Sequence, residues 1–328
     1  MTKDDTAPLL KVENLSVRFA VKRQGAFGQK EYLYAVDDVS FDVSRGETLG
    51  IVGESGSGKT TTALAVARLV DAYGGKVTMG GEDFLAFEGE ELRKARARCQ
   101  FIFQDPYSSL NPRLRAEAVV REPLDSLTDT AESEKQEIVD RLFSEVGLRK
   151  EQQRLFPHQF SGGQRQRIGI ARALATHPDL IICDEPVSAL DVAVQAQILN
   201  LLRKLQQDLD LTYLFISHDL GVVQHMCDSI AVMYMGKIVE SAPVADIFSN
   251  PKHPYTQKLL QSIPVLGRAK DQTIRPIQGS TPNPLKLPQG CSFGPRCDHC
   301  WGKCQETPPL FSVGHDHQAA CWLYAEGY

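Results

Sequence analysis

The stretch that decides the fold is Gly53-Glu54-Ser55-Gly56-Ser57-Gly58-Lys59-Thr60. It fits the phosphate-binding pattern G-x-x-x-x-G-K-[ST], in which successive backbone N–H groups surround nucleotide phosphates. Glycine permits the tight wrap of such a loop. In this pattern Lys59 reaches the β- and γ-phosphates, and the Thr60 hydroxyl coordinates Mg²⁺. The stretch therefore predicts a site for ATP and Mg²⁺ but leaves the task of the protein open.

The sequence on either side supplies the context that this loop needs. Residues 48–52 form a short apolar run that predicts a buried strand, and residues 60–70 consist of good helix formers. Strand, glycine-rich loop and helix in this order are typical of a phosphate-binding unit. Further along, apolar strands alternate with helical patterns, among them a helix over residues 192–209. This alternation predicts an α/β fold with a parallel sheet covered on both faces.

Two carboxylates end another apolar run, at residues 180–183. Asp184 and Glu185 follow directly, and a buried strand can hold them rigidly beside the phosphate loop. We expect Asp184 to bind Mg²⁺, directly or through water, and Glu185 to polarise the attacking water as general base. Two acids after a strand also occur in solvated turns, and the upstream phosphate loop is what favours the catalytic interpretation.

A second motif is Phe160-Ser161-Gly162-Gly163-Gln164. It resembles the signature L-S-G-G-Q of ATP-binding cassette (ABC) proteins, with Phe160 in place of the usual Leu. Ser161, Gly162 and Gly163 are expected to open a helix, where free N–H groups and the helix dipole make an anion site. In this family that site faces the γ-phosphate held by the phosphate loop of a second cassette. The resemblance therefore implies that ATP joins two cassettes and that hydrolysis releases them.

Other segments resemble further motifs of the ABC family. Gln104 lies in a segment like the Q-loop, where it would sense the γ-phosphate through Mg²⁺ or water, and His218 resembles the switch histidine. Residues 188–191 resemble the D-loop, which couples two sites across a dimer. Phe19 is the candidate for stacking on adenine, with Tyr32 and Tyr34 as rivals. The resemblance implies that Glu185, His218 and Gln104 are catalytic. It also implies that Thr60, Gln104 and Asp184 are the ligands of Mg²⁺. The residues expected around the nucleotide are Phe19, Gly53, Ser55, Gly56, Gly58, Lys59, Thr60, Thr61, Asp184, Ser161, Gly162, Gly163, Gln164 and Asp191.

The resemblance also divides the chain into parts. It implies an ABC nucleotide-binding domain over residues 9–262, which begins with an antiparallel β subdomain and contains a helical subdomain at about residues 105–160. A loop-rich, cysteine-containing C-terminal extension follows over residues 263–328. Within the helical insertion we expect an amphipathic helix over residues 132–146 and chain breaks at three prolines, Pro106, Pro112 and Pro123.

Five of the eight cysteines lie between Cys291 and Cys321. In a reducing compartment such a cluster predicts a metal site before it predicts disulfides. The resemblance implies a [4Fe–4S] cluster, with zinc or free thiols as alternatives, held by Cys291, Cys297, Cys304 and Cys321. Cys300 is additional, and His315 and His317 are expected at the surface. The other three cysteines are expected to be buried and inert, namely Cys99, Cys183 and Cys227.

The group that the chain resembles most is the ATPase subunits of bacterial oligopeptide/dipeptide importers. Residues 103–112 resemble the F-type member, and His253-Pro254-Tyr255-Thr256 also matches the group. The resemblance implies that the cargo is a peptide. It also implies three kinds of partner: two membrane permease subunits, a second and paralogous ATPase subunit, and an extracytoplasmic substrate-binding protein. Importers of nickel, opines or sugars, an exporter ATPase, and a soluble ABC ATPase of translation or DNA repair remain alternatives.

Composition restricts where such a protein acts. The net charge of −5 argues against a protein that coats nucleic acid. No apolar run approaches the roughly 18 residues of a membrane span, and the first residues are too polar for a signal peptide. We therefore expect a peripheral protein at the cytoplasmic face of the inner membrane, held there by permease subunits.

Overall fold

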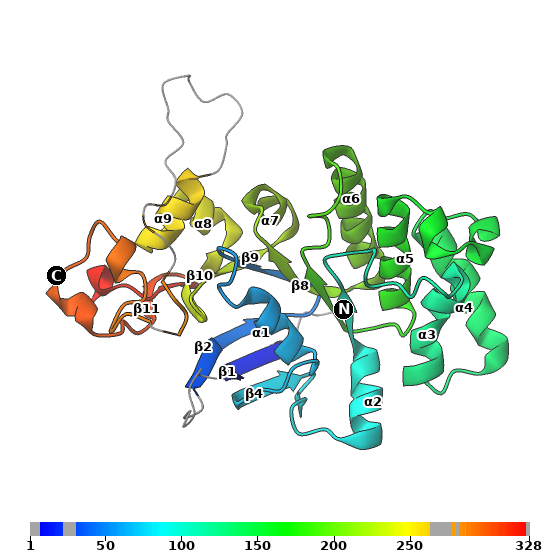
Figure 1. Ribbon diagram of the computed structural model, residues 1–328, viewed down its shortest axis with the longest axis horizontal. Coiled ribbons are helices and arrows are strands. Elements are labelled where there is room, and N and C mark those ends of the chain that lie inside the picture. Colours follow the sequence, from blue (N-terminus) through cyan, green and yellow to red (C-terminus); the bar gives the residue numbers. More distant parts are fainter. Residues whose placement is uncertain are drawn as a thin grey trace, which may run out of the picture.

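The computed structural model describes residues 7–21, 31–262, 277, 279, 282–285 and 287–325. Within these ranges the strands form two sheets (Figure 1). The smaller sheet has the order β2-β1-β4-β5 and is antiparallel. Its strands are β1 (Leu10–Val21), β2 (Glu31–Val43), β4 (Gly74–Met79) and β5 (Glu82–Asp83). The antiparallel β subdomain expected near the N-terminus is therefore present.

The larger sheet has the order β11-β12-β10-β9-β3-β8-β7-β6 among the described residues. Its centre is parallel, as the alternation of strands and helices predicts. Every residue of three strands, at residues 48–52, 180–184 and 212–217, is buried, which explains their continuous apolar runs. The parallel strands are β3 (Thr48–Val52), β6 (Cys99–Ile102), β7 (Leu180–Asp184), β8 (Thr212–Ser217) and β9 (Ser229–Tyr234).

Alternate residues of these strands face two separate hydrophobic cores. Leu214 and Ile216 of β8 belong to the core shared with β1 and α1 (Lys59–Val66), while Tyr213 and Phe215 belong to the core on the other face. The period of two along a strand produces this division. The second core contains the apolar stripe of α6 (Val192–Leu209) and residues of α7 (Leu220–Met226). The sheet is thus covered on both faces.

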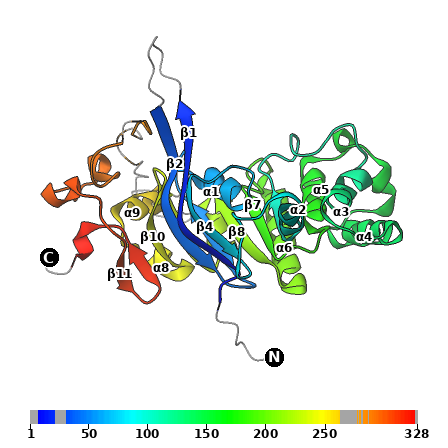
Figure 2. The ribbon, with the colours of Figure 1, turned by 90° about the horizontal axis from the view of Figure 1, so that it is seen from below.

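A group of helices lies at one end of the molecule (Figures 1 and 2). It comprises α3 (Ala116–Leu127), α4 (Glu132–Glu145) and α5 (Gly162–Leu174), with α2 (Gly89–Arg98) beside it and two short 3₁₀ turns, η1 (Lys150–Arg154) and η2 (Pro157–Gln159). The predicted break at Pro123 is wrong, because α3 runs through this residue. Pro123 is buried there beside Val119, Val120 and Leu124, and this packing retains the helix.

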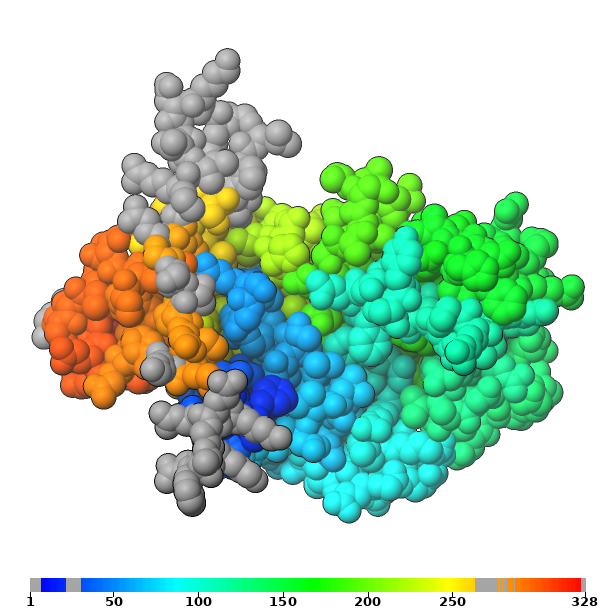
Figure 3. All heavy atoms as spheres, in the orientation of Figure 1, coloured from blue at the N-terminus to red at the C-terminus, as the bar shows by residue number. Residues whose placement is uncertain are grey.

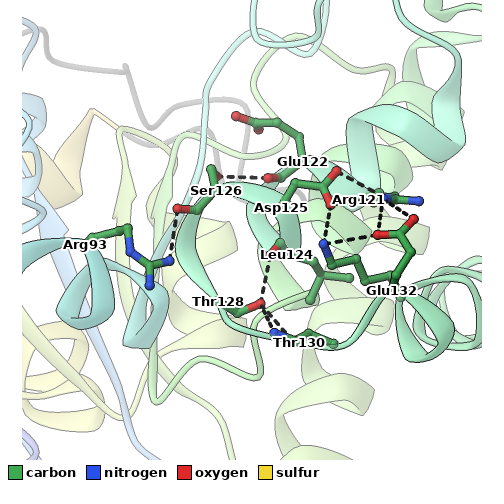
Figure 4. Close-up of polar contacts among 10 residues, drawn as sticks. Arg93, Arg121, Glu122, Leu124, Asp125, Ser126, Thr128, Thr130 and Glu132 are labelled. Carbon is green, nitrogen blue, oxygen red and sulfur yellow. Dashed lines mark hydrogen bonds and ion pairs between the residues drawn. The ribbon is translucent and has the colours of Figure 1, made fainter. Parts of the chain in front are cut away.

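Ion pairs and hydrogen bonds tie these helices together at their surface (Figure 4). The Arg121 guanidinium pairs with Asp125 on the same helix and with Glu132 at the beginning of α4. Arg93 of α2 donates to the Ser126 carbonyl, 3.2 Å away, at the end of α3. The helical part is therefore linked to α2 through a side chain as well as through the backbone.

The C-terminal extension occupies the opposite end of the molecule, coloured orange and red in Figure 3. Its hairpin, β11 (Phe311–Gly314) and β12 (His317–Ala319), joins the large sheet because β12 pairs with β10 (Lys237–Pro243). The extension also contains the 3₁₀ turns η3 (Gly294–Arg296), η4 (Gly302–Gln305) and η5 (Trp322–Tyr324). Two helices that precede it in the chain, α8 (Val244–Ser249) and α9 (Pro254–Gln261), lie at the same end of the molecule (Figure 1). Residues 263–276 of the predicted extension lie outside the described residues.

The surface position predicted for His317 is wrong. Its Nε2 atom lies 2.7 Å from Oε1 of Glu240, and both side chains are buried where β12 pairs with β10. His315 is exposed, as expected. In the described parts of the chain, no helix combines the length and the apolar character that crossing a membrane requires.

Candidate nucleotide-binding and catalytic site

The phosphate loop connects β3 to α1, and two of its glycines are required by packing. Gly53 has φ 154° and Gly58 has φ 107°. A Cβ atom at Gly53 would lie 2.1 Å from the Met233 carbonyl oxygen, and one at Gly58 would lie 2.3 Å from the Ala35 carbonyl oxygen. Both positions therefore exclude any side chain, and the loop passes directly against neighbouring backbone.

Lys59 is folded back over this loop. Its ammonium group donates to the carbonyl oxygens of Gly53 at 2.8 Å and Glu54 at 2.9 Å. Burial lowers the pKa of Lys59, and the negative charges of Glu185 and Asp184 oppose this shift. A cation that is desolvated and already inside the loop is suited to bind phosphate oxygens.

Two of the three residues expected to bind Mg²⁺, Thr60 and Asp184, meet at the beginning of α1. The Thr60 hydroxyl donates to Oδ1 of Asp184 at 3.0 Å. Burial raises the pKa of Asp184, which the bond from Thr60 opposes. A hydroxyl and a partly desolvated carboxylate are the hard oxygen ligands that Mg²⁺ prefers, so this pair fits the predicted ion.

Glu185 lies between the two other predicted catalytic side chains. Gln104 donates from Nε2 to Oε2 of Glu185 at 2.7 Å, and Nδ1 of His218 lies 2.9 Å from Oε1. The three residues follow β6, β7 and β8, which are neighbours in the sheet, so the topology brings them to one edge. Glu185 also has a positive φ of 46°, a conformation that non-glycine residues adopt at a cost and that clusters at functional sites.

The signature residues begin α5 as the sequence predicts. Ser161 is the N-cap, and a reciprocal pair of hydrogen bonds joins it to Gln164. Gly163 lies so close to α6 that an added Cβ would be 2.4 Å from Cγ1 of Val194. Asp191 caps α6 by accepting the N–H of Val194 at 3.0 Å. The signature and the D-loop are thus fixed against each other at the beginnings of two neighbouring helices.

In Figures 1 and 2, α5 belongs to the helical end of the molecule, whereas α1, which directly follows the phosphate loop, lies at its centre. The structure therefore brings together the phosphate loop, Asp184, Glu185, Gln104 and His218. The signature lies elsewhere.

The candidates for stacking on adenine lie on β1 and β2. Phe19 pairs with Leu33 in the antiparallel ladder, and its side chain is 41% exposed. The rivals are similarly exposed but are engaged by neighbours. The Arg18 guanidinium lies 4.1 Å from the centroid of the Tyr32 ring, and the Tyr34 ring meets Tyr73 edge-on at 6.2 Å. Phe19 stays the prediction for this role.

Sequence reasoning missed two residues that contact the phosphate loop. Arg296 forms an ion pair with Glu54 at 2.7 Å, and the Tyr255 hydroxyl accepts the N–H of Glu54 at 2.9 Å. Tyr255 falls within a stretch that the sequence singles out, but no local pattern links Arg296 to a loop 242 residues earlier.

Four tail cysteines line one small cavity of about 10 Å³ together with Trp301 and Trp322; they are Cys291, Cys297, Cys304 and Cys321. In the part of the chain that the structure describes, no three His, Cys, Asp or Glu side chains converge closely enough to hold a metal ion. Four cysteine thiols are nevertheless a donor set that iron and zinc both bind. Burial raises the pKa of Cys291 to about 11 and also raises the pKa values of Cys297 and Cys321, so a bound metal would have to displace their protons.

The remaining cysteines behave differently. Cys300 is exposed and does not line the cavity of the other four. Cys99, Cys183 and Cys227 are buried, and burial raises the pKa of Cys99 to about 12. The prediction that these three thiols are buried is confirmed, and the raised pKa makes Cys99 unreactive.

Comparison with known proteins agrees with this geometry. Residues 36–188 match the ABC transporter family, and residues 239–304 match the C-terminal region of oligopeptide/dipeptide transporters. The chain is 44% identical to the oligopeptide transport ATP-binding protein AppF of Bacillus subtilis, over 99% of this chain and 100% of that protein. It is 45% identical to a putative peptide import ATP-binding protein of Brucella abortus, over 90% of this chain and 89% of the relative.

A solved structure shows the same fold. The ATP-binding cassette MJ0796, a dimer in a post-hydrolysis state bound to ADP and Pi, is 29% identical and superimposes with a TM-score of 0.63 over 72% of this chain and 98% of that one. The phosphate loop, the side chains of Gln104, Glu185 and His218 at one sheet edge, and these relatives lead to one conclusion. The chain belongs to the ATP-binding subunits of ABC transporters, which hydrolyse ATP, and specifically to the oligopeptide/dipeptide group.

Proposed function

We propose that this chain powers an importer of di- and oligopeptides at the cytoplasmic face of the membrane, bound to two permease subunits and supplied by an extracytoplasmic binding protein. The observation that carries the proposal is the match over residues 239–304 to the C-terminal region of oligopeptide/dipeptide transporters. The names of the relatives, which are ATP-binding proteins of peptide transport and import, support the same cargo.

The proposed hydrolysis assigns one task to each side chain at the sheet edge. The backbone N–H groups of the phosphate loop and Lys59 hold the β- and γ-phosphates. Thr60, Asp184 and Gln104 would hold Mg²⁺, which when bound would supply positive charge beside the phosphates. Glu185 accepts a proton from the attacking water as general base, and His218 orients the γ-phosphate. The contacts of Glu185 with Gln104 and His218 support this arrangement.

The signature completes the site from a second cassette. The N-terminus of α5 presents free N–H groups, and its separation from the phosphate loop of the same chain leaves them available to a nucleotide on a partner. We propose that this partner is a paralogous ATPase subunit. The solved cassette MJ0796 is dimeric, which supports pairing of two cassettes.

The test is to express the chain with the permease, binding-protein and ATPase genes that neighbour its own, and to reconstitute the complex in vesicles. We expect ATP-dependent uptake of labelled di- or oligopeptides, and none of nickel, opines or sugars. Uptake of one of those solutes instead would replace peptide as the cargo. A chain that assembles with no permease would favour a soluble ABC ATPase.

We further propose that Cys291, Cys297, Cys304 and Cys321 bind a [4Fe–4S] cluster, with zinc as the alternative. Their common cavity and the affinity of cysteine thiolates for iron and zinc support this set. When bound, the group would cross-link four loop segments and contribute folding free energy to the extension.

Anaerobically purified protein should carry about four iron atoms per chain. Cys297→Ser should lose most of the iron, whereas the matched variant Cys300→Ser should retain it, because Cys300 is exposed outside the cavity. Stoichiometric zinc would favour the alternative. Metal-free protein with an ordered extension would contradict the proposal.

A further inference from the structure

We infer that Arg296 and Tyr255 are positioning residues of the ATPase site, which hold the phosphate loop in its binding conformation through Glu54. The inference concerns the hydrolysis reaction and does not depend on the cargo proposed above. It rests on a contact between two regions at opposite ends of the sequence, the loop after β3 and the segment that contains η3.

The ion pair is bidentate and largely shielded from water. Nη1 of Arg296 donates to Oε2 of Glu54 at 2.7 Å, and Nη2 donates to Oε1 at 3.0 Å. The two side chains are 4% and 24% exposed. Bidentate guanidinium–carboxylate pairs fix direction as well as distance, so Arg296 sets the orientation of the Glu54 side chain.

The backbone of Glu54 is held as well. Its N–H donates to the hydroxyl of Tyr255, which lies fully buried on α9, and its carbonyl oxygen accepts from Lys59. The Tyr234 ring packs on Tyr255 with centroids 4.6 Å apart, and the Tyr234 hydroxyl also accepts from Arg296 at 3.3 Å. The residue after Gly53 is thus held by its side chain, its N–H and its carbonyl group.

These contacts connect the cysteine-lined segment to the nucleotide site. Arg296 directly precedes Cys297, and its own carbonyl oxygen accepts from Lys258 of α9 at 2.8 Å. Because the guanidinium is buried, movement of η3 would leave it without its carboxylate partner, which is costly. The conformation of the extension and that of the phosphate loop therefore depend on each other, and binding of ATP at one must affect the other.

The test is steady-state ATP hydrolysis by the assembled transporter containing the full-length chain. Arg296→Gln should raise KM for Mg-ATP about tenfold and leave kcat nearly unchanged. The reason is that a phosphate loop that has lost its orientation binds substrate ATP and the transition state of hydrolysis more weakly by the same factor. Glu54→Gln should show the same split. The double variant should be no worse than either single one, since both remove the same contact. Arg296→Lys, which keeps the charge, should recover part of the affinity.

Lys303→Met is the matched control. It removes an ion pair with Glu306 inside the extension but touches neither Arg296 nor Glu54, so KM should stay at the wild-type value. An unchanged KM in both Arg296→Gln and Glu54→Gln would overturn the inference. A rise in Lys303→Met as large as that in Arg296→Gln would also overturn it, since a general disturbance of the extension would then explain the effect.

A second measurement does not depend on whether Arg296→Gln folds. In the wild-type complex, saturation with a non-hydrolysable ATP analogue should change the amide hydrogen-exchange rates of residues 291–305 by at least about threefold. Glu54→Gln should abolish this response. Identical exchange with and without nucleotide in the wild type would contradict the coupling.

Discussion

Among single residues, Glu185 and Asp184 are adjacent in sequence but have different surroundings. Glu185 lies in a left-handed conformation between Gln104, which donates a hydrogen bond to one carboxylate oxygen, and His218, whose ring nitrogen lies 2.9 Å from the other. Asp184 ends a fully buried strand and has one neutral donor, Thr60. The first arrangement suits a base that acts on a positioned water, and the second suits a ligand that awaits a cation.

Glu185→Gln should nearly abolish hydrolysis, with a loss on the order of 10²–10⁴ in kcat. ATP affinity should persist because Gln keeps the shape of the side chain and leaves the phosphate loop intact. Turnover and nucleotide binding by the assembled transporter would measure both. Lys59→Ala provides the contrast, since it should weaken nucleotide binding itself. Retention of most activity in Glu185→Gln would contradict its role as general base.

Asp184→Asn should raise the melting temperature of the nucleotide-free protein at pH 7. Burial raises the pKa of Asp184 above the ordinary 3.8, so the charged form is less favourable in the folded than in the unfolded chain. The gain should disappear as the pH falls below about 3.8, where the carboxyl group is protonated in both states. Thermal unfolding should be measured with and without Mg-ATP. The rise in melting temperature that Mg-ATP causes should be smaller in the variant than in the wild type. A lower melting temperature at pH 7 would contradict this account.

Among the elements, close packing of the signature helix α5 against α6 fixes the anion site. Gly163 of α5 meets Val194 of α6 without room for a methyl group. Phe160, which stands where the family usually has Leu, is 4% exposed. It belongs to the hydrophobic core that contains residues of α6 and α7, so the larger ring is accommodated. Elsewhere in this region, Asp140 of α4 accepts hydrogen bonds from Lys150 and Gln153 of η1 and from Gln136 on its own helix.

Gly163→Ala should reduce ATP hydrolysis at least about tenfold, because the new Cβ would displace the beginning of α5. Val194→Ala in the same chain should restore much of the activity by removing the atom with which that Cβ collides. Hydrolysis rates of the two single variants and the double variant decide the matter. If the second substitution fails to restore activity, the methyl group added at residue 163 clashes with the bound nucleotide rather than with α6.

Asp140→Asn should destabilise the protein at pH 7 but not at pH 2. Hydrogen bonds from Lys150, Gln153 and Gln136 lower the pKa of Asp140 to about 2, from an ordinary 3.8. A depressed pKa contributes stability above pH 3.8, and this contribution is lost as the pH falls toward 2. The Asp140 side chain is 29% exposed and water still screens its charge, so the loss of stability at pH 7 should be about 1 kcal/mol. Urea unfolding of both proteins at the two pH values would test this.

In the molecule as a whole, the nucleotide site lies between two peripheral parts. The helices α3, α4 and α5 form one end and the C-terminal extension forms the other (Figure 3). The segment between Gln104 and Ser161 is attached at both ends to residues that we assign to γ-phosphate sensing. A helical part with these attachments is placed to move when ATP binds and to transmit this movement to a permease.

Arg113→Glu and Arg115→Glu should impair transport more than ATP binding. Both side chains are exposed on the segment before α3, which we expect to abut a cytoplasmic helix of the permease. Lys204→Glu on α6 is the matched control, since it reverses an exposed charge away from this segment. Uptake and nucleotide affinity should be measured on the same vesicles. Crosslinks that place the permease on α6 would contradict this docking site.

Much of the site follows from local signals in the sequence. The phosphate loop is encoded by glycines at fixed offsets, and the buried strands are encoded by uninterrupted apolar runs that end in polar residues. Because the carboxyl ends of neighbouring parallel strands share one sheet edge, the pattern also brings Gln104, Glu185 and His218 together. These features depend on backbone period and on residues close in sequence.

The sequence by itself therefore determined the cassette, its parallel sheet and most of the nucleotide site. Only the tertiary structure decided that α3 runs through Pro123, that His317 is buried on Glu240, and that Arg296 holds Glu54. The physical reason is common to all three. Each of these three features depends on the packing or charge of a partner residue that folding brings close. A periodic pattern along the chain does not predict which distant residues will come into contact.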